Sequence, residues 1–148
     1  MASIEDVRDL VAGDHGLATI SVVRDDGTIH SSVINAGVIS HPTTGELVVA
    51  AVVRGSSWKL RRLRQTQRCT LVFRVGWQWI SVDGPVDISG PEDHLAGVAS
   101  HQVPKLLRDV FVAAGGSHDD WAEYDRVMAE DRRTAVLITA ERIQSPRP

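Results

Sequence analysis

The chain has 148 residues with 16 basic and 19 acidic side chains, so its formal net charge is −3, and 43% of its residues are hydrophobic. This length predicts one globular domain over residues 1–148, and the mildly acidic balance argues against a nucleic-acid-binding protein. A single cysteine, Cys69, excludes an internal disulfide, which fits a cytoplasmic protein. The amino-terminal residues lack the regions of a signal peptide, and no apolar run approaches the ~20 residues that span a membrane.

The first half of the chain predicts a helix followed by an antiparallel meander. Apolar residues recur at helical spacing over residues 3–12, where Ser3 and Asp6 approximate a capping box. β-Branched and apolar stretches predict strands over residues 16–23, 28–40 and 46–53. Asp25-Asp26-Gly27 has the composition of a hairpin turn between the first two of these strands.

The second half predicts further strands, with helices inserted late. We expect a helix over residues 57–65, strands over 69–75 and 77–83, a bend at 83–85, and a continuation of that strand over 86–89. A helix over 91–100 is predicted because Pro91 suits a first helical turn and two acidic residues follow it. A helix over 105–114, one capped by Ser117 and a strand over 133–140 complete the chain. About six strands without regular βαβ alternation favour a mainly β protein, a small antiparallel barrel with packed helices.

Residues 54–68, called here the basic segment, carry six of the 16 basic residues, and no acidic residue occurs between Glu46 and Asp83. Ser56 or Ser57 can cap a helix there, and free N–H groups at a helix start suit a phosphate. Three interpretations stay open: a solvated surface helix, a nucleic-acid contact, or an anion site. Lys59 favours the anion site, because a cation in the first helical turn is otherwise disfavoured by the helix dipole.

Two other groups of residues are candidates for a binding site. Trp77 and Trp79 lie on one face of a predicted strand, where they could form a wall for an aromatic ligand, part of the core, or a subunit interface. His30, Ser32 and the neighbouring backbone could hydrogen-bond the edge of a heterocyclic ring, or could simply face solvent.

Motifs for other chemistries are missing. The sequence has no metal-binding motif, no G-x-S-x-G, and no Rossmann or P-loop glycine pattern. Cys69 lies in an apolar strand and is expected to be buried and inert. No catalytic residue is identified, which favours an enzyme whose chemistry belongs to a bound cofactor.

Several motifs, in this order, resemble the pyridoxamine 5′-phosphate oxidase-like, flavin-binding split-barrel superfamily. They are Asp25-Asp26-Gly27, the strand over 28–40, the run over 57–64, Trp77-Gln78-Trp79 and Gly84. The motifs over 120–124 and 131–133 resemble its actinobacterial branch that uses the deazaflavin coenzyme F420, the flavin/deazaflavin oxidoreductase B group. The resemblance covers nearly the whole chain.

The resemblance implies a six-stranded Greek-key split barrel that forms a homodimer, with two cofactor sites at the subunit interface. It implies that Lys59 and nearby cations hold the cofactor phosphate. Ser57 stands where relatives often carry Arg, and Arg54 is one residue that could supply this charge. The residues expected to contact the cofactor are Arg54, Ser57, Lys59, Arg61 and Arg62 around its tail, His30, Ser32, Val33 and Asn35 along its ring system, and Trp77 and Trp79 near the interface.

The activity implied is hydride transfer from reduced F420 to a small unsaturated or oxidised organic substrate. Three alternatives remain: an FMN-dependent oxidoreductase of the same fold, a non-catalytic protein that carries a cofactor or haem, and, last, a nucleic-acid-binding module that uses the basic segment.

Overall fold

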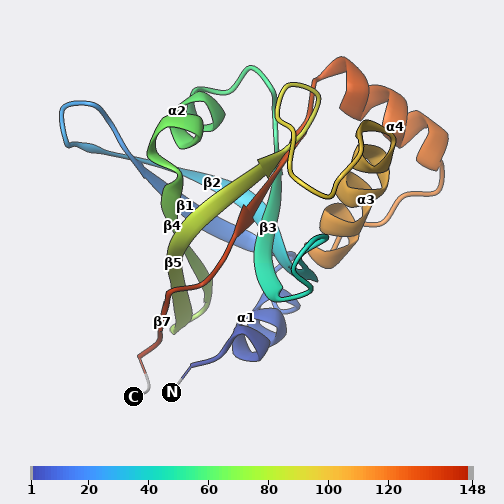
Figure 1. The fold of residues 1–148 in the computed structure, drawn as a ribbon. Helices are drawn as coiled ribbons and strands as arrows, with labels where there is room; N and C mark the ends of the chain where they lie inside the picture. Colours follow the sequence, from blue (N-terminus) through green and yellow to red (C-terminus); the bar gives the residue numbers. More distant parts are fainter. Residues whose placement is uncertain (1, 147–148) are drawn as a thin grey trace.

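The computed structural model describes residues 2–146, which form an antiparallel β-barrel with helices around it (Figure 1). The strand order is β4-β1-β2-β3-β6-β5, and β4 also pairs with β5, so six strands close into a barrel and β7 extends it beside β5. The strands are β1 (Leu17–Val23), β2 (Ile29–Ser40), β3 (Leu47–Val53), β4 (Arg68–Val75), β5 (Gln78–Ser89), β6 (Thr134–Ile138) and β7 (Arg142–Gln144). The predicted six-stranded antiparallel barrel is confirmed.

Four α-helices and one 3₁₀ turn lie within the described residues: α1 (Ile4–Val11), α2 (Trp58–Thr66), α3 (Val103–Ala113), α4 (Trp121–Glu130) and the turn Ser100–Gln102. The predicted capping box of α1 is confirmed, because Ser3 Oγ accepts from the Asp6 amide at 3.3 Å and Asp6 Oδ2 accepts from the Ser3 amide at 2.8 Å. Ser57 caps α2 by accepting from the Leu60 amide at 3.3 Å. Over the residues described, no helix is long and apolar enough to cross a membrane.

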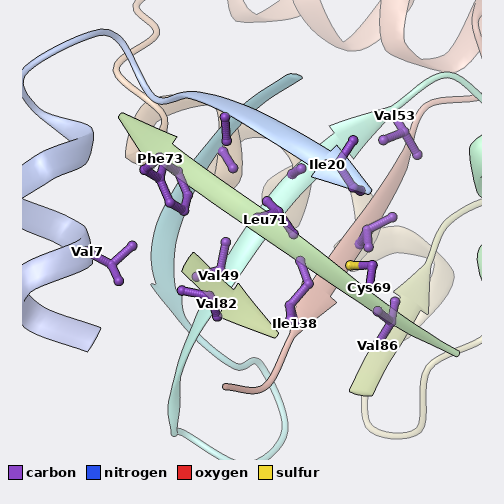
Figure 2. Packing of buried hydrophobic residues seen from close by; sticks show 14 of the residues in the cluster. Val7, Ile20, Val49, Val53, Cys69, Leu71, Phe73, Val82, Val86 and Ile138 are labelled. Atoms are coloured by element: carbon purple, nitrogen blue, oxygen red, sulfur yellow. The ribbon is translucent and has the colours of Figure 1, made fainter. Parts of the chain in front are cut away.

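The barrel interior holds the main hydrophobic core (Figure 2). Ile20, Leu71 and Phe73 lie inside it, because alternate residues of each strand point inward. Helices α1 and α2 add Val7, Leu60 and other apolar side chains to the same cluster, and Figure 1 shows these helices at opposite ends of the barrel. Cys69 belongs to this core, as its apolar surroundings in the sequence predicted.

A second core lies on the outer face of β3 and β6. There α3 places Leu106, Leu107 and Val110 against Val48 and Leu137. Helix α3 covers the outer face of β3 and β6, and their other face points into the core of the barrel. Most of β3 and all of β6 are therefore buried on both faces. This double burial explains the uninterrupted apolar run of β3 in the sequence.

Strand β2 has two different partners along its length. Its first part, residues 29–35, pairs with β1, whereas residues 36–40 pair with β3. The ladder between β2 and β3 therefore starts at Ala36, and the two strands diverge over residues 29–35 of β2. At the point of divergence α3 packs closely on β2, because a Cβ at Gly37 would come within 2.6 Å of the Ala114 amide nitrogen.

The structure corrects the prediction in three places. Residues 91–100 do not form the predicted helix but an irregular segment, because the acidic side chains that suggested a helix start instead pair with Arg64 and Arg132. Asp120, not Ser117, caps α4. A short strand, β7, follows β6 and was not predicted. The predicted bend at 83–85 matches the place where β5 changes partner from β4 to β6.

Candidate functional site

A pocket of about 680 Å³ opens where β2 and β3 diverge. Its walls come from β2, the end of β3, the loop into α2, helices α3 and α4, and the start of β6. The residues that line the pocket include Val33, Ile34, Asn35, Arg54, Ser56, Ser57, Lys59, Val110, Phe111, Ala114, Tyr124, Met128 and Arg133. The pocket thus brings together five residues predicted for the cofactor site: Val33, Asn35, Arg54, Ser57 and Lys59.

One wall of the pocket is a free strand edge. The Ala36 amide donates to Gly16 O at 2.8 Å, toward the β1 side. Because hydrogen-bonding groups of alternate residues point to opposite edges of a strand, the N–H and C=O groups of Ser31, Val33 and Asn35 point to the other edge. That edge has no strand partner over residues 29–35. It offers a row of alternating donors and acceptors beside the pocket.

The opposite wall is cationic. Lys59 stands in the first turn of α2, half-buried, and its side chain makes no hydrogen bond or ion pair with any residue in the range 2–146. Burial, and then the charge of Arg133, lower the pKa of Lys59. Arg54 is exposed at the pocket and likewise has no bonded partner among the described side chains. An anion between these cations would relieve their repulsion.

Arg133 was not predicted as a site residue, and the tertiary structure places it beside Lys59. The last turn of α4 ends with Arg132 in the left-handed region, at φ 51°, and the Arg133 amide donates to Met128 O at 2.9 Å. This turn packs on the loop before α2, where the Gly55 amide donates to Asp131 O at 3.2 Å. A Cβ at Gly55 would lie 2.7 Å from the Arg132 Cβ, so glycine permits this close packing. The motif over 131–133 was the one signal in the sequence for Arg133.

The other end of the pocket is apolar and aromatic. Phe111 and Tyr124 lie 4.9 Å apart between ring centroids, and both line the pocket. Tyr124 Oη donates to Leu107 O at 3.2 Å, and burial raises the pKa of this phenol. The tyrosine hydroxyl is therefore engaged in the fold, and the ring surfaces are what this end offers to a ligand.

Arg61 and Arg62 do not line the pocket. Arg62 fastens α2 to the β1–β2 hairpin, since its Nε donates to Val23 O at 2.5 Å and its Nη1 contacts Asp25 Oδ1 at 2.6 Å. Arg61 is exposed on the outside of α2.

The four residues predicted along the ring system divide between the two faces of β2. His30 and Ser32 are opposite the buried residues Val22 and Ile20 of β1, so they face the barrel side, whereas Val33 and Asn35 point to the outer face. The His30 and Trp58 rings lie 5.0 Å apart between centroids and are tilted by 51° to each other. His30 Nδ1 and Ser32 Oγ are buried and have no hydrogen-bond partner within residues 2–146.

Trp77 and Trp79 lie away from the pocket of the single chain. Trp77, at the turn between β4 and β5, is 96% exposed, and Trp79 is 36% exposed on the outer face of β5. Exposure this large for an indole at a hairpin turn is typical of a surface that contacts another molecule.

The described residues offer little chemistry of their own to the pocket. No group of three or more His, Cys, Asp or Glu residues that could hold a metal occurs within residues 2–146. Burial raises the pKa of Cys69 to about 12, so this thiol is not a nucleophile in the folded protein. The arrangement is suited to holding an elongated ligand with an anionic end, a polar ring edge and a flat apolar face.

No protein-family model matches the chain. Among solved structures, a conserved hypothetical protein from Mycobacterium tuberculosis is similar with a TM-score of 0.69 and 21% identity, over 98% of this chain and 84% of that one. An F420 reductase is similar with a TM-score of 0.62 and 13% identity, over 93% and 94%. A protein of the pyridoxinephosphate oxidase family from Clostridium acetobutylicum has a TM-score of 0.62 and 14% identity, over 96% and 86%. At these identities the comparisons establish the fold alone: this chain has the same antiparallel barrel with packed helices as these proteins.

Proposed function

We propose that the pocket binds a phosphorylated flavin-type cofactor, coenzyme F420, and that the protein is an F420-dependent reductase. The observation that carries this proposal is the presence, in one pocket, of the unpaired Lys59 beside Arg133, a free strand edge and an aromatic wall. The fold shared with an F420 reductase agrees with it. When bound, reduced F420 would supply a hydride to a small unsaturated or oxidised organic substrate.

The residues of the chain would divide the work of binding. Lys59, Arg133 and the amides at the start of α2 would hold the phosphate, because two cations and a helix N-terminus favour an anion. The free edge of β2 would hydrogen-bond the polar edge of the ring. Asn35 Nδ2 already donates to His15 O at 2.8 Å, so its Oδ1 would serve as an acceptor. Phe111 would cover one face of the ring and exclude water.

The protein would act as a homodimer. Four apolar side chains are exposed on the outer face of β1 and β2: Leu17, Val23, Ile29 and Val33. Val33 is 65% exposed and also lines the pocket, so a second copy on this face would lie beside the cofactor site. Trp77 and Trp79 would belong to the same interface. Sedimentation should give a dimer for the natural chain and a monomer for Val33→Asp; a monomeric natural chain would remove this part of the proposal.

Side-by-side titration with F420 and FMN tests the cofactor. Tryptophan quenching should saturate with F420 below roughly 100 μM, a binding free energy of about 5–6 kcal/mol. The main alternative is FMN, which would give a yellow protein with flavin absorbance and tighter binding of FMN than of F420. Saturation by neither compound would defeat both versions, and a Soret band after haem addition would identify a haem carrier instead.

A further inference from the structure

Four buried side-chain atoms lack a hydrogen-bond partner among the described residues, and they fall into two pairs. His30 Nδ1 and Ser32 Oγ lie on β2. Ser89 Oγ lies at the end of β5, and Arg133 Nε belongs to the residue just before β6. Native proteins rarely leave buried polar atoms unpaired, so each pair needs an explanation such as a bound ligand or water.

Ser89 and Arg133 line a groove whose wall also includes residues from the segment 90–103. Two adjoining cavities of about 220 Å³ and 140 Å³ form this groove. They share four lining residues: Gly90, Pro91, Ser100 and Val103. The larger cavity extends between α3 and α4 along Pro104, Leu107 and Ala129, so its walls are mainly apolar. Ser89 belongs to the smaller cavity and Arg133 to the larger one.

The strand register brings the two polar residues to the same end of the β5–β6 ladder. Ser89 is directly opposite Ala135 in the last pair of that ladder, and Arg133 lies two residues before Ala135. A ligand that fills both cavities would therefore meet a hydroxyl at one end and a guanidinium at the other.

Nearby acidic residues are already paired. Arg108 Nε contacts Asp125 at 2.9 Å, Arg64 bonds Asp93 with both Nε and Nη2, and Arg132 contacts Glu92 at 2.8 Å. Arg133 has only a 3.4 Å contact from Nη2 to Asp131 among the described residues. Arg133 is therefore the least engaged charged group of the groove, and its buried Nε has no hydrogen-bond partner among the described residues.

We propose that the groove is a second ligand site, for a small planar carboxylic acid that carries a hydroxyl group at its far end. The carboxylate would pair with Arg133, the hydroxyl would hydrogen-bond Ser89 Oγ, and the ring would lie between the apolar walls. The groove shares only Arg133 and Met128 with the proposed cofactor pocket, so the two ligands would occupy different cavities and would both contact Arg133.

The probe is 4-hydroxybenzoate, titrated into the full chain by calorimetry and followed by amide chemical shifts. The expected result is saturable binding, at least about tenfold tighter than that of benzoate or 4-hydroxybenzamide, which each lack one of the two polar ends. Ser89→Ala should remove the preference for 4-hydroxybenzoate over benzoate. This substitution deletes one buried oxygen, so it tests the site without filling it.

Two filling variants and one control locate the ligand. Ser100→Phe and Ala129→Phe place a ring in the groove from opposite walls, and neither residue lines the cofactor pocket. Each should weaken 4-hydroxybenzoate at least about tenfold while leaving cofactor affinity unchanged. Lys59→Ala should leave 4-hydroxybenzoate binding unchanged. Loss of binding in Lys59→Ala would place the acid in the cofactor pocket and overturn the proposal, as would no binding, equal binding of the three probes, or unchanged binding in both filling variants.

Discussion

The cations of the basic segment behave in two ways, although they are close in sequence. Arg62, Arg64 and Arg68 each hold a partner, respectively Asp25, Asp93 and Glu141. Lys59 and Arg54 line the pocket and hold none among the described residues. A run of positive charge therefore does not define a site. The site is formed by the cations that the fold places at the pocket and leaves without an anion among the described residues.

The pKa values express the same difference. Hydrogen bonds to Asp93 and Glu141 raise the pKa of Arg64 and of Arg68. Burial and the neighbouring Arg133 lower the pKa of Lys59. The paired arginines are stabilised in their charged form, whereas Lys59 is charged at a cost that a bound anion would offset.

The largest effect is expected from a substitution that weakens the packing of α2 on the barrel, because this packing supports both groups of cations. Leu63 is fully buried between α2 and the barrel, so Leu63→Ala should lower the free energy of unfolding by about 2–5 kcal/mol. Urea denaturation measures this change. Arg61→Ala, on the exposed side of the same helix, is the matched control and should change stability by less than about 0.5 kcal/mol. Equal effects of the two substitutions would mean that α2 does not anchor the segment.

The second largest effect is expected on cofactor binding when the unpaired cation, Lys59, is removed. Lys59→Met should weaken binding of the cofactor phosphate by about 1–3 kcal/mol, because a charge-assisted hydrogen bond is lost. The same variant should be as stable as the natural chain or more stable, since a partly desolvated charge beside Arg133 is removed. Cofactor titration and thermal unfolding measure the two quantities. Unchanged affinity would make Lys59 an ordinary surface lysine.

A smaller effect is expected for a paired cation. Arg64→Ala breaks two hydrogen bonds to Asp93, at 2.9 and 2.7 Å, which hold residues 90–103 against α2. The pair is partly exposed and screened by solvent, so the loss of stability should be about 1 kcal/mol or less. Cofactor affinity should stay unchanged. A drop in affinity as large as that of Lys59→Met would contradict the division between paired and unpaired cations.

The smallest expected effect is the change of stability and of cofactor affinity with pH. Because the folded pKa of Lys59 lies below 10.5, its unfavourable charge is present in the folded state at neutral pH and is lost as pH rises through that folded pKa. The stability difference between Lys59→Met and the natural chain should therefore shrink toward pH 10.5. Cofactor affinity of the natural chain should fall over the same pH range, and that of Lys59→Met should not. Denaturation and titration at several pH values check both trends.

Local sequence patterns determined most of the barrel. The strands over β1 to β5, the capping box at Ser3 and the start of α2 at Ser57 all depend on residues a few positions apart, where periodicity and capping act. The same kind of pattern failed at residues 91–100, because Arg64 and Arg132 bind the acidic residues that locally favour a helix start.

Only the tertiary structure decided which cations remain unpaired. Arg64 meets Asp93 across 29 positions and Arg68 meets Glu141 across 73, and no local pattern predicts these pairs. Arg133 reaches Lys59 because the turn after α4 packs on Gly55. The sequence by itself determined that a charged helix follows β3. Which of its arginines form ion pairs, and which cation remains open to an anion, was decided only in the closed barrel. Electrostatic partners depend on distance in space rather than on distance along the chain.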